Sequence, residues 1–274
     1  MKDNVNIIFL GDIVGRQGRR VVESYINSLE NKPDFLIANV ENASHGFGLT
    51  KKNHDELSQV GIDVFTSGNH IWDKREIFDY IEESDRLIRP LNYPKNTPGE
   101  GYRIFEKEGV KLGVINVLGR TFMNLIDSPW GILEETIKKI KEETPLIFVD
   151  VHAEATAEKL CMARFCDELG VSALAGTHTH IQTADERILE NGLGYITDAG
   201  YCGDTSGIIG MNYEQSIKRM ITSLPDRLDV SVSEDLQING VELAVNVVSG
   251  RTETIKRIDL KYKDNEGNII MKGK

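Results

Sequence analysis

Short apolar runs rich in β-branched residues alternate with amphipathic stretches over the first two thirds of the chain. This alternation is typical of βαβ units and of a largely parallel sheet. Between the first two runs, Val21, Val22, Tyr25, Ile26 and Leu29 recur at helical spacing, which predicts a helix with one face packed on a sheet. The pattern predicts an α/β protein with strands at residues 5–10, 35–40, 63–66, 111–117, 146–151 and 171–175.

The pattern changes after residue 198, where a glycine-rich loop is followed by a predicted helix near residues 213–224. Two antiparallel strands are predicted at residues 241–248 and 254–262, joined around residues 249–251. Residues 89–101 contain three prolines and two glycines, which predicts an irregular segment on the surface. The sequence has no internal repeat, low-complexity tract or linker, so we expect residues 1–274 to form a single domain.

The formal net charge of −11 limits the partners of the chain. A protein that holds long DNA or RNA normally presents a basic face, and none is visible, so no stable binding of long nucleic acid is expected. Small nucleotides remain suitable ligands because a metal site supplies its own positive charge. No stretch reaches the roughly 20 apolar residues that span a bilayer, and the N-terminus does not resemble a signal peptide. We therefore expect a cytoplasmic protein with no membrane association.

The three cysteines, Cys161, Cys166 and Cys202, include no C-x-x-C pair. They indicate neither a disulfide framework nor a thiolate zinc site. We expect them to be small core residues, with the first two on a helix.

Polar side chains follow the ends of five of the six predicted strands. The carboxyl ends of parallel strands converge on one crevice, where ligands bind. Structural roles are also open for single residues: Asp12 alone favours a helix cap, and Glu41 with Asn42 favours an exposed turn. Asn69 tolerates left-handed backbone geometry, so a turn beside Gly68 is an equal alternative.

Four of the six histidines, namely His70, His152, His178 and His180, lie at these strand ends. His70 and His152 also fit the role of hydrogen-bonded buried imidazoles. The pair His178 and His180 is harder to explain structurally, because in extended backbone both side chains point the same way and can serve one metal cluster.

If His70 is kept for catalysis, the other candidates offer carboxylate and amide oxygens and imidazole nitrogens but no thiolate. Such a set suits Mn²⁺, Fe²⁺/Fe³⁺ or Zn²⁺, with a carboxylate able to bridge two ions. Two ions roughly 3.5–4 Å apart can hold a hydroxide nucleophile and clamp the oxygens of a phosphoryl displacement. A histidine beside a ligand is a candidate for protonating the leaving alkoxide. The candidate ligands are Asp12, Glu41, Asn42, Asn69, His152, His178 and His180.

These motifs resemble those of the calcineurin-like metallophosphoesterases. The segment Gly68-Asn69-His70 matches the third motif of that family, Val151-His152 the fourth, and the segment at 176–180 the fifth with one residue inserted. The usual second-position histidine after Asp12 is missing, and Glu41 stands at the bridging aspartate position. These departures are characteristic of the YmdB-type phosphodiesterases, whose motifs resemble segments 11–15, 38–43 and 66–72.

The resemblance implies an α/β/β/α sandwich of two mixed sheets, a dinuclear centre of iron with manganese or zinc as alternatives, and a homo-oligomer. It implies hydrolysis of small phosphodiesters, including 2′,3′-cyclic nucleotides, with His70 as general acid. It further implies that Asp12 and His180 hold one metal with Asn42 replacing the missing histidine, that Asn69, His152 and His178 hold the other, and that Glu41 bridges.

Two other interpretations compete with an enzyme of this kind. Gly11, Gly15 and Gly18 follow the first strand as in nucleotide-binding folds, but their spacing is not G-x-G-x-x-G and Asp12 would face a pyrophosphate. The other alternative is a non-catalytic or slow regulator that senses a nucleotide in the same cleft. Tyr201, Cys202 and the loop at 203–210 either line the cleft or are structural.

Overall fold

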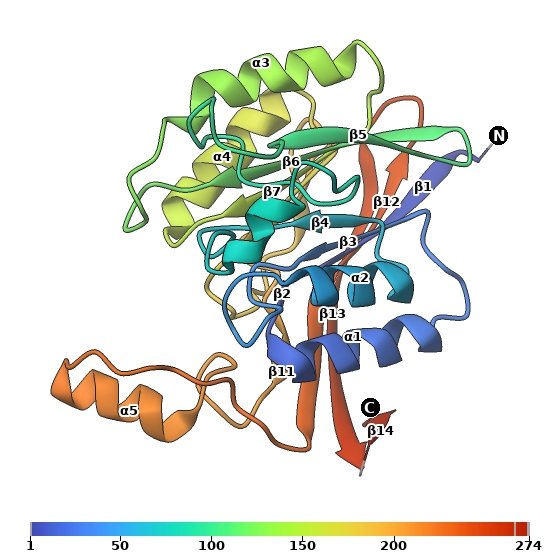
Figure 1. The fold of residues 1–274 in the computed structure, drawn as a ribbon. Helices are drawn as coiled ribbons and strands as arrows, with labels where there is room; N and C mark the ends of the chain where they lie inside the picture. The colour runs from blue at the N-terminus through green and yellow to red at the C-terminus, as the bar shows by residue number, and fades with distance from the viewer. Residues whose placement is uncertain (1, 266, 273–274) are drawn as a thin grey trace.

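The computed structural model describes residues 2–265 and 267–272. Two β-sheets pack face to face, and helices cover the outer face of each sheet (Figure 1). Phe9 of one sheet meets Phe148 of the other with ring centroids 4.9 Å apart, inside the apolar layer between the sheets. The chain is thus an α/β/β/α sandwich, as predicted.

The first sheet contains β1 (Asn4–Leu10), β3 (Phe35–Asn39), β4 (Val64–Thr66), β12 (Asp235–Asn246), β13 (Thr252–Asn265) and β14 (Asn268–Met271). Their order is β14-β13-β12-β1-β3-β4, and the short strands β2 (Asp12–Ile13) and β11 (Tyr201–Asp204) attach through β12. β1, β3 and β4 are parallel, whereas β12 runs antiparallel to β1 and β13. The sheet is therefore mixed.

The second sheet contains β5 (Tyr102–Lys107), β6 (Val110–Leu118), β7 (Ile147–His152), β8 (Ala173–Thr177), β10 (Gly194–Ile196) and β9 (Arg187–Ile188), in that order. Its four central strands are parallel and its two edge strands are antiparallel to their neighbours. β7 and β8, which carry histidines at their ends, lie in the middle of the sheet.

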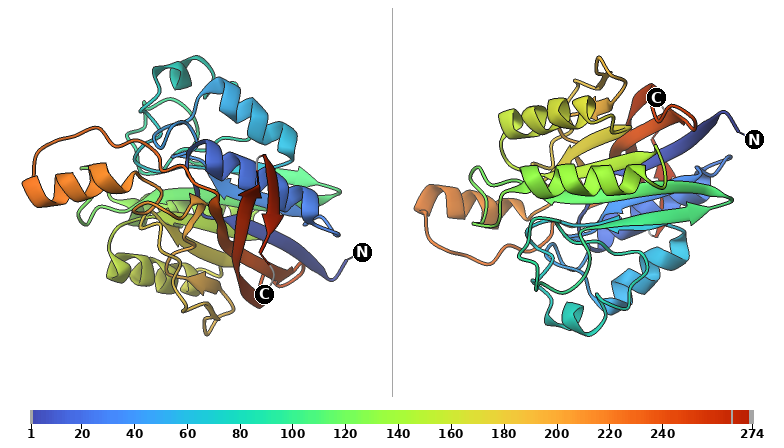
Figure 2. Two further views of the ribbon diagram at one scale, coloured as in Figure 1. Left: turned by 90° about the horizontal axis from the view of Figure 1, so that it is seen from below. Right: turned by 90° about the horizontal axis from the view of Figure 1, so that it is seen from above.

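The helices α1 (Gly15–Ser28) and α2 (Lys51–Val60) cover the first sheet, and α3 (Pro129–Lys141) and α4 (Thr156–Glu168) cover the second (Figures 1 and 2). α1 buries the predicted apolar face, including Val21, Val22 and Tyr25. The 3₁₀ helix η1 (Arg75–Asp79) follows β4, and α5 (Tyr213–Thr222) projects from the rest of the molecule in all views.

The six strands predicted in the first two thirds are confirmed to within two residues at each end. The two C-terminal strands are also confirmed, but β12 begins at Asp235 and so is longer than predicted. The prediction that all three cysteines are core residues is wrong for Cys161, which lies on an exposed face of α4. Among the described residues, no helix is both long and apolar enough to cross a membrane.

The segment 89–101 is irregular, as predicted, but it does not lie wholly on the surface. Arg89 is buried and donates hydrogen bonds to the carbonyl oxygens of Pro90, Thr97 and Pro98 at 2.7, 3.1 and 3.1 Å. An inward-facing arginine therefore supplies the hydrogen-bond donors that the regular ladder of a strand would have supplied.

Candidate metal centre

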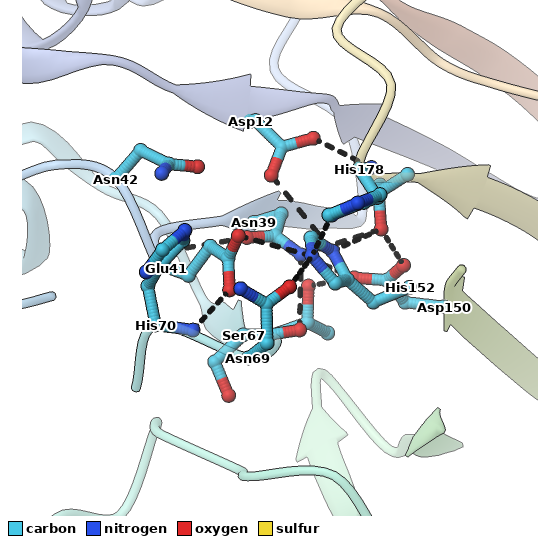
Figure 3. A network of polar contacts seen from close by, with 12 residues as sticks. Asp12, Asn39, Glu41, Asn42, Ser67, Asn69, His70, Asp150, His152 and His178 are labelled. Atoms are coloured by element: carbon cyan, nitrogen blue, oxygen red, sulfur yellow. Dashed lines mark hydrogen bonds and ion pairs between the residues drawn. The ribbon is translucent and has the colours of Figure 1, made fainter. Parts of the chain in front are cut away.

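Both sheets direct polar side chains toward one site. The first sheet and the loops after it contribute Asp12, Glu41, Asn42, Asn69 and His70, and the second contributes His152, His178 and His180. The donor atoms of Glu41, His152 and His178 all lie within 4.8 Å of one another, close enough to bind one ion. Figure 3 shows the labelled side chains gathered around His152.

The Nε2 atom of His152 lies at the centre of these contacts. It is 3.0 Å from Glu41 Oε1, 3.0 Å from Asn69 Oδ1 and 3.0 Å from His178 Nδ1. One hydrogen on Nε2 can serve only one of these three atoms, each of which can act as an acceptor. A cation among them would satisfy all of these atoms at once.

A buried chain of hydrogen bonds determines which nitrogen of His152 is free. The hydroxyl of Thr177 donates to Asp150 Oδ1 at 2.7 Å, and it lies 2.9 Å from Nδ1 of His152. Since its hydrogen is used by Asp150, the hydroxyl accepts the Nδ1 hydrogen of His152. This arrangement turns Nε2 toward the cluster, where a bound cation would take the place of its proton, as in metal-binding histidines.

A second group of donors lies around Asp12. Asp12 Oδ1 and Asn42 Oδ1 are buried and have no hydrogen-bond partner among the described residues. His180 Nε2 is 3.9 Å from Asp12 Oδ1, and His180 Nδ1 is 2.9 Å from the carbonyl oxygen of Ile209, which can only accept. Because unpaired buried oxygens are costly, these atoms fit a second cation.

The structural alternatives for Asp12, Glu41 and Asn42 do not hold. Val14, and not Asp12, is the N-cap of α1, and it makes no side-chain cap. Asn69 does lie in a turn after Gly68, where the N–H of Ile71 donates to the carbonyl oxygen of Gly68 at 3.4 Å, but its φ is not positive. Glu41 and Asn42 are buried at 1% and 2% exposure, so they do not form an exposed turn.

The expectation that His178 and His180 lie in extended backbone is wrong. Their φ angles are 99° and 62°, in a region that residues other than glycine rarely adopt. The two rings consequently face different parts of the cluster: His178 faces His152, and His180 faces Asp12. Such strained backbone is found at functional sites, where surrounding contacts stabilise it.

The electrostatics of the site favour a positive charge on His152 but not on His178. Burial lowers the pKa of His152, but Glu41 and Asp12 outweigh this effect and raise it to about 9. Burial raises the pKa of Glu41, but His152 and the backbone N–H of His70 outweigh it and lower the value to about 2. Burial and His152 lower the pKa of His178 to about 3, which keeps this imidazole neutral and able to bind a metal.

His70 lies at the edge of the cluster with its side chain 29% exposed. Its backbone N–H donates to Glu41 Oε2 at 2.8 Å, and its Nδ1 is 2.8 Å from Asp73 Oδ2. Its ring packs edge-on against Phe47 with centroids 4.9 Å apart. The ring is thus oriented by neighbours on both sides and remains accessible from solvent.

Several supporting residues were not identified from the sequence. Asp150 of β7 accepts hydrogen bonds from Asn39 Nδ2 at 2.9 Å and from the hydroxyls of Thr66 and Thr177. Burial raises its pKa to about 7. One indication of this role was present in the sequence: Asp150 lies within an apolar strand, where a buried carboxylate needs hydrogen-bond donors.

β11 and the loop after it contact the centre through Tyr201 and Ile209, which decides between the two predicted roles of these residues. The ring of Tyr201 stacks on His180 with centroids 5.5 Å apart, and the carbonyl of Ile209 orients the same imidazole. Cys202 is instead buried and lies 3.4 Å from the carbonyl oxygen of Asn239. Tyr201 and Ile209 therefore support the site, and Cys202 is structural.

Comparison with known proteins identifies the family of the chain. A family model described as YmdB-like protein matches residues 8–258. The chain belongs to the YmdB-like family. A 2′,3′-cyclic-nucleotide 2′-phosphodiesterase of Bacillus subtilis (strain 168) is 45% identical over 256 residues, covering 93% of this chain and 96% of that protein.

Solved structures of similar chains have the same fold. A novel phosphatase from Mycoplasma pneumoniae superposes with a TM-score of 0.89 at 33% identity, covering 97% of each chain. A hypothetical protein from Thermus thermophilus superposes with a TM-score of 0.87 at 34% identity, covering 93% of this chain and 99% of that one. The fold is that of the metallophosphoesterases, and membership of the YmdB-like family implies divalent metal ions.

Proposed function

We propose that the chain is a metal-dependent phosphodiesterase that hydrolyses phosphodiesters such as 2′,3′-cyclic nucleotides. The observation that carries this proposal is the convergence of Glu41, Asn69 and His178 on Nε2 of His152, which a cation would satisfy. The related Bacillus subtilis phosphodiesterase supports the substrate class. These findings favour an enzyme over a non-catalytic nucleotide sensor.

The seven predicted ligands fit a centre of two ions, which would stabilise the charge of a phosphoryl displacement and supply an activated water. The unpaired oxygens of Asp12 and Asn42 support one ion, and the crowded Nε2 of His152 supports the other. The proposed ligands are Asp12, Asn42 and His180 for the first ion, Asn69, His152 and His178 for the second, and Glu41 between them.

We propose iron as the resident metal, with manganese or zinc as alternatives, because the donor set combines oxygens and imidazoles without thiolate. Metal analysis of protein purified without oxygen tests this assignment. Iron in about two equivalents per chain is the expected result, and a single equivalent of any metal would contradict a dinuclear centre.

The proposed general acid is His70. Its Nδ1 is paired with Asp73 at 2.8 Å, so its Nε2 is the nitrogen that remains to donate a proton to the leaving oxygen. The hydrogen bond from its backbone to Glu41 keeps the acid close to the proposed bridging carboxylate. The reacting phosphate would therefore lie between the ions and His70.

The proposed location is the cytoplasm, and the proposed assembly is a homo-oligomer. The exposed side chains of Met220, Ile221 and Leu224, at 82%, 76% and 62% exposure, support a surface between copies. Light scattering of the purified protein tests the assembly. A monomer at micromolar concentration would contradict it.

The enzymatic proposal is tested with 2′,3′-cyclic AMP and bis-p-nitrophenyl phosphate, using protein reconstituted with Fe²⁺ or Mn²⁺ and a chelated control. We expect turnover that disappears on chelation. We expect His70→Ala to lower kcat by about 10²–10⁴-fold, the range of general acid catalysis, without loss of metal. A folded protein with two metals and no turnover would support the nucleotide-sensing alternative, and full activity of His70→Ala would remove His70 from its role.

A further inference from the structure

A cavity of about 410 Å³ opens beside His70. Its walls come from the loop after β3, from the segment after β4, and from α5 with the loop that follows, and they include Lys74, Arg219 and Arg227. Its volume lies in the range of small-molecule sites. A ligand in this cavity would be next to the proposed general acid.

Two of the three cations in the cavity wall are not used by the protein. Arg227 is paired with Asp229 at 3.3 Å. Within residues 2–265 and 267–272, the side chains of Lys74 and Arg219 form no hydrogen bond or ion pair. Solvated lysines and arginines are common on surfaces, but these two come from distant parts of the chain and line the same cavity.

The acidic groups of the cavity are already occupied. Asp73 contacts His70 at 2.8 Å, and Asp226 accepts a hydrogen bond from Lys218 at 2.9 Å. The carboxylates therefore do not neutralise Lys74 and Arg219 by direct contact. In a chain of net charge −11, a cavity with two unpaired cations is suited to an anion.

The position of the general acid defines which part of a substrate would occupy the cavity. In an in-line displacement the leaving oxygen lies opposite the nucleophile, and the acid must lie next to that oxygen. The ribose of a 2′,3′-cyclic nucleotide would consequently lie on the His70 side. The 5′ position of that ribose is where a nucleotide carries its next phosphate.

We propose that Lys74 and Arg219 form a subsite for a second phosphate group of the substrate. The preferred substrate is then a nucleoside 2′,3′-cyclic phosphate with a phosphate at its 5′ position. That phosphate is either a terminal monoester or the link to a preceding nucleotide. The subsite rests on the proposed function, because its place is defined by the role of His70.

The test compares kcat/KM for adenosine 2′,3′-cyclic phosphate, its 5′-phosphate, and the dinucleotide that ends in the same cyclic phosphate. We expect kcat/KM for the 5′-phosphorylated compound to be about ten-fold higher than for adenosine 2′,3′-cyclic phosphate, which is the effect of one charge-assisted hydrogen bond. If kcat/KM rises equally for the dinucleotide, the subsite accepts a phosphodiester link to a preceding nucleotide. If kcat/KM rises only for the 5′-monoester, the subsite accepts a terminal phosphate.

Variants assign this preference to the two cations. We expect Arg219→Ala and Lys74→Ala to reduce the ratio of the two kcat/KM values toward one, and Arg219→Lys to retain part of it. Lys138→Ala is the matched control, because it removes one exposed positive charge on α3, outside the cavity. It leaves the ratio unchanged.

Binding gives a readout that does not depend on turnover. Calorimetry with adenosine 3′,5′-bisphosphate and with adenosine 3′-monophosphate should show about ten-fold tighter binding of the bisphosphate, and Arg219→Ala should remove the difference. Equal kcat/KM and equal binding with and without the 5′-phosphate would overturn the subsite alone. Absence of turnover on every substrate would instead refute the proposed function, and the binding comparison would still decide the subsite.

Discussion

Replacing Lys159 by methionine tests how the loop that carries His178 and His180 is held. Lys159 of α4 and Asp198 form an ion pair at 2.7 Å, and both side chains are 1% exposed. Asp198 also accepts hydrogen bonds from the backbone N–H and the hydroxyl of Thr179, at 3.1 and 2.8 Å. The pair therefore anchors the residue between the two histidines.

Methionine keeps much of the length and volume of lysine but leaves the carboxylate of Asp198 without its cation. Removing one partner of a buried pair costs about 3–5 kcal/mol, because the other charge stays buried. At about 2–4 °C per kcal/mol, we expect the melting temperature followed by circular dichroism to fall by roughly 6–20 °C. The affinity for metal should also fall, since Thr179 loses a fixed acceptor.

Two further variants control this experiment. Lys138→Met removes an exposed pair with Glu134 and should cost less than about 1 kcal/mol. Lys159→Met combined with Asp198→Asn should recover part of the loss, because the buried charge is gone while an amide oxygen can still accept. Equal melting temperatures for Lys159→Met and Lys138→Met would refute the argument that this buried pair anchors the loop.

Two other substitutions and one calorimetric melt have expected outcomes. Thr177→Val removes the hydroxyl that orients His152, and we expect metal affinity measured by calorimetry to fall about 10–100-fold with little change in fold. Gly68→Ala would place a Cβ in steric overlap with His152 Cδ2 and Glu41 Oε2, so metal content should fall, whereas Gly131→Ala, with nothing within 4 Å, should be neutral. We also propose that the chain is a single domain, because the two sheets share one apolar layer; two separate transitions in a calorimetric melt would contradict this.

The sequence predicted the central strands well because they are buried on both faces. β7 and β8 are buried along their whole length, which requires continuous apolar runs that stand out from helical periodicity. Strands at the edges of a sheet are not buried on both faces, so they lack such apolar runs. β5 was not predicted, since it has no fully buried residue. α2 was also not predicted, because it buries only Asn53, His54 and Leu57, too few to give a helical pattern of apolar residues.

The candidate site was predictable as a set of residues but not as a geometry. Strand ends of parallel sheets converge, so the sequence alone brought Asp12 and His152 together. The left-handed backbone of His178 and His180 was not predictable, because it depends on contacts such as those of Asp198 with Thr179 and of Ile209 with His180. Local sequence favours ordinary φ values at these positions, and tertiary contacts override that preference.

The division of the proposed ligands between the two sheets has a consequence for folding. All the oxygen donors come from the first sheet, and all the imidazoles come from the second. A folding intermediate with only one sheet assembled would lack one donor type entirely and would hold ions weakly. Tight metal uptake during refolding would thus report the moment at which the two halves of the sandwich close on each other.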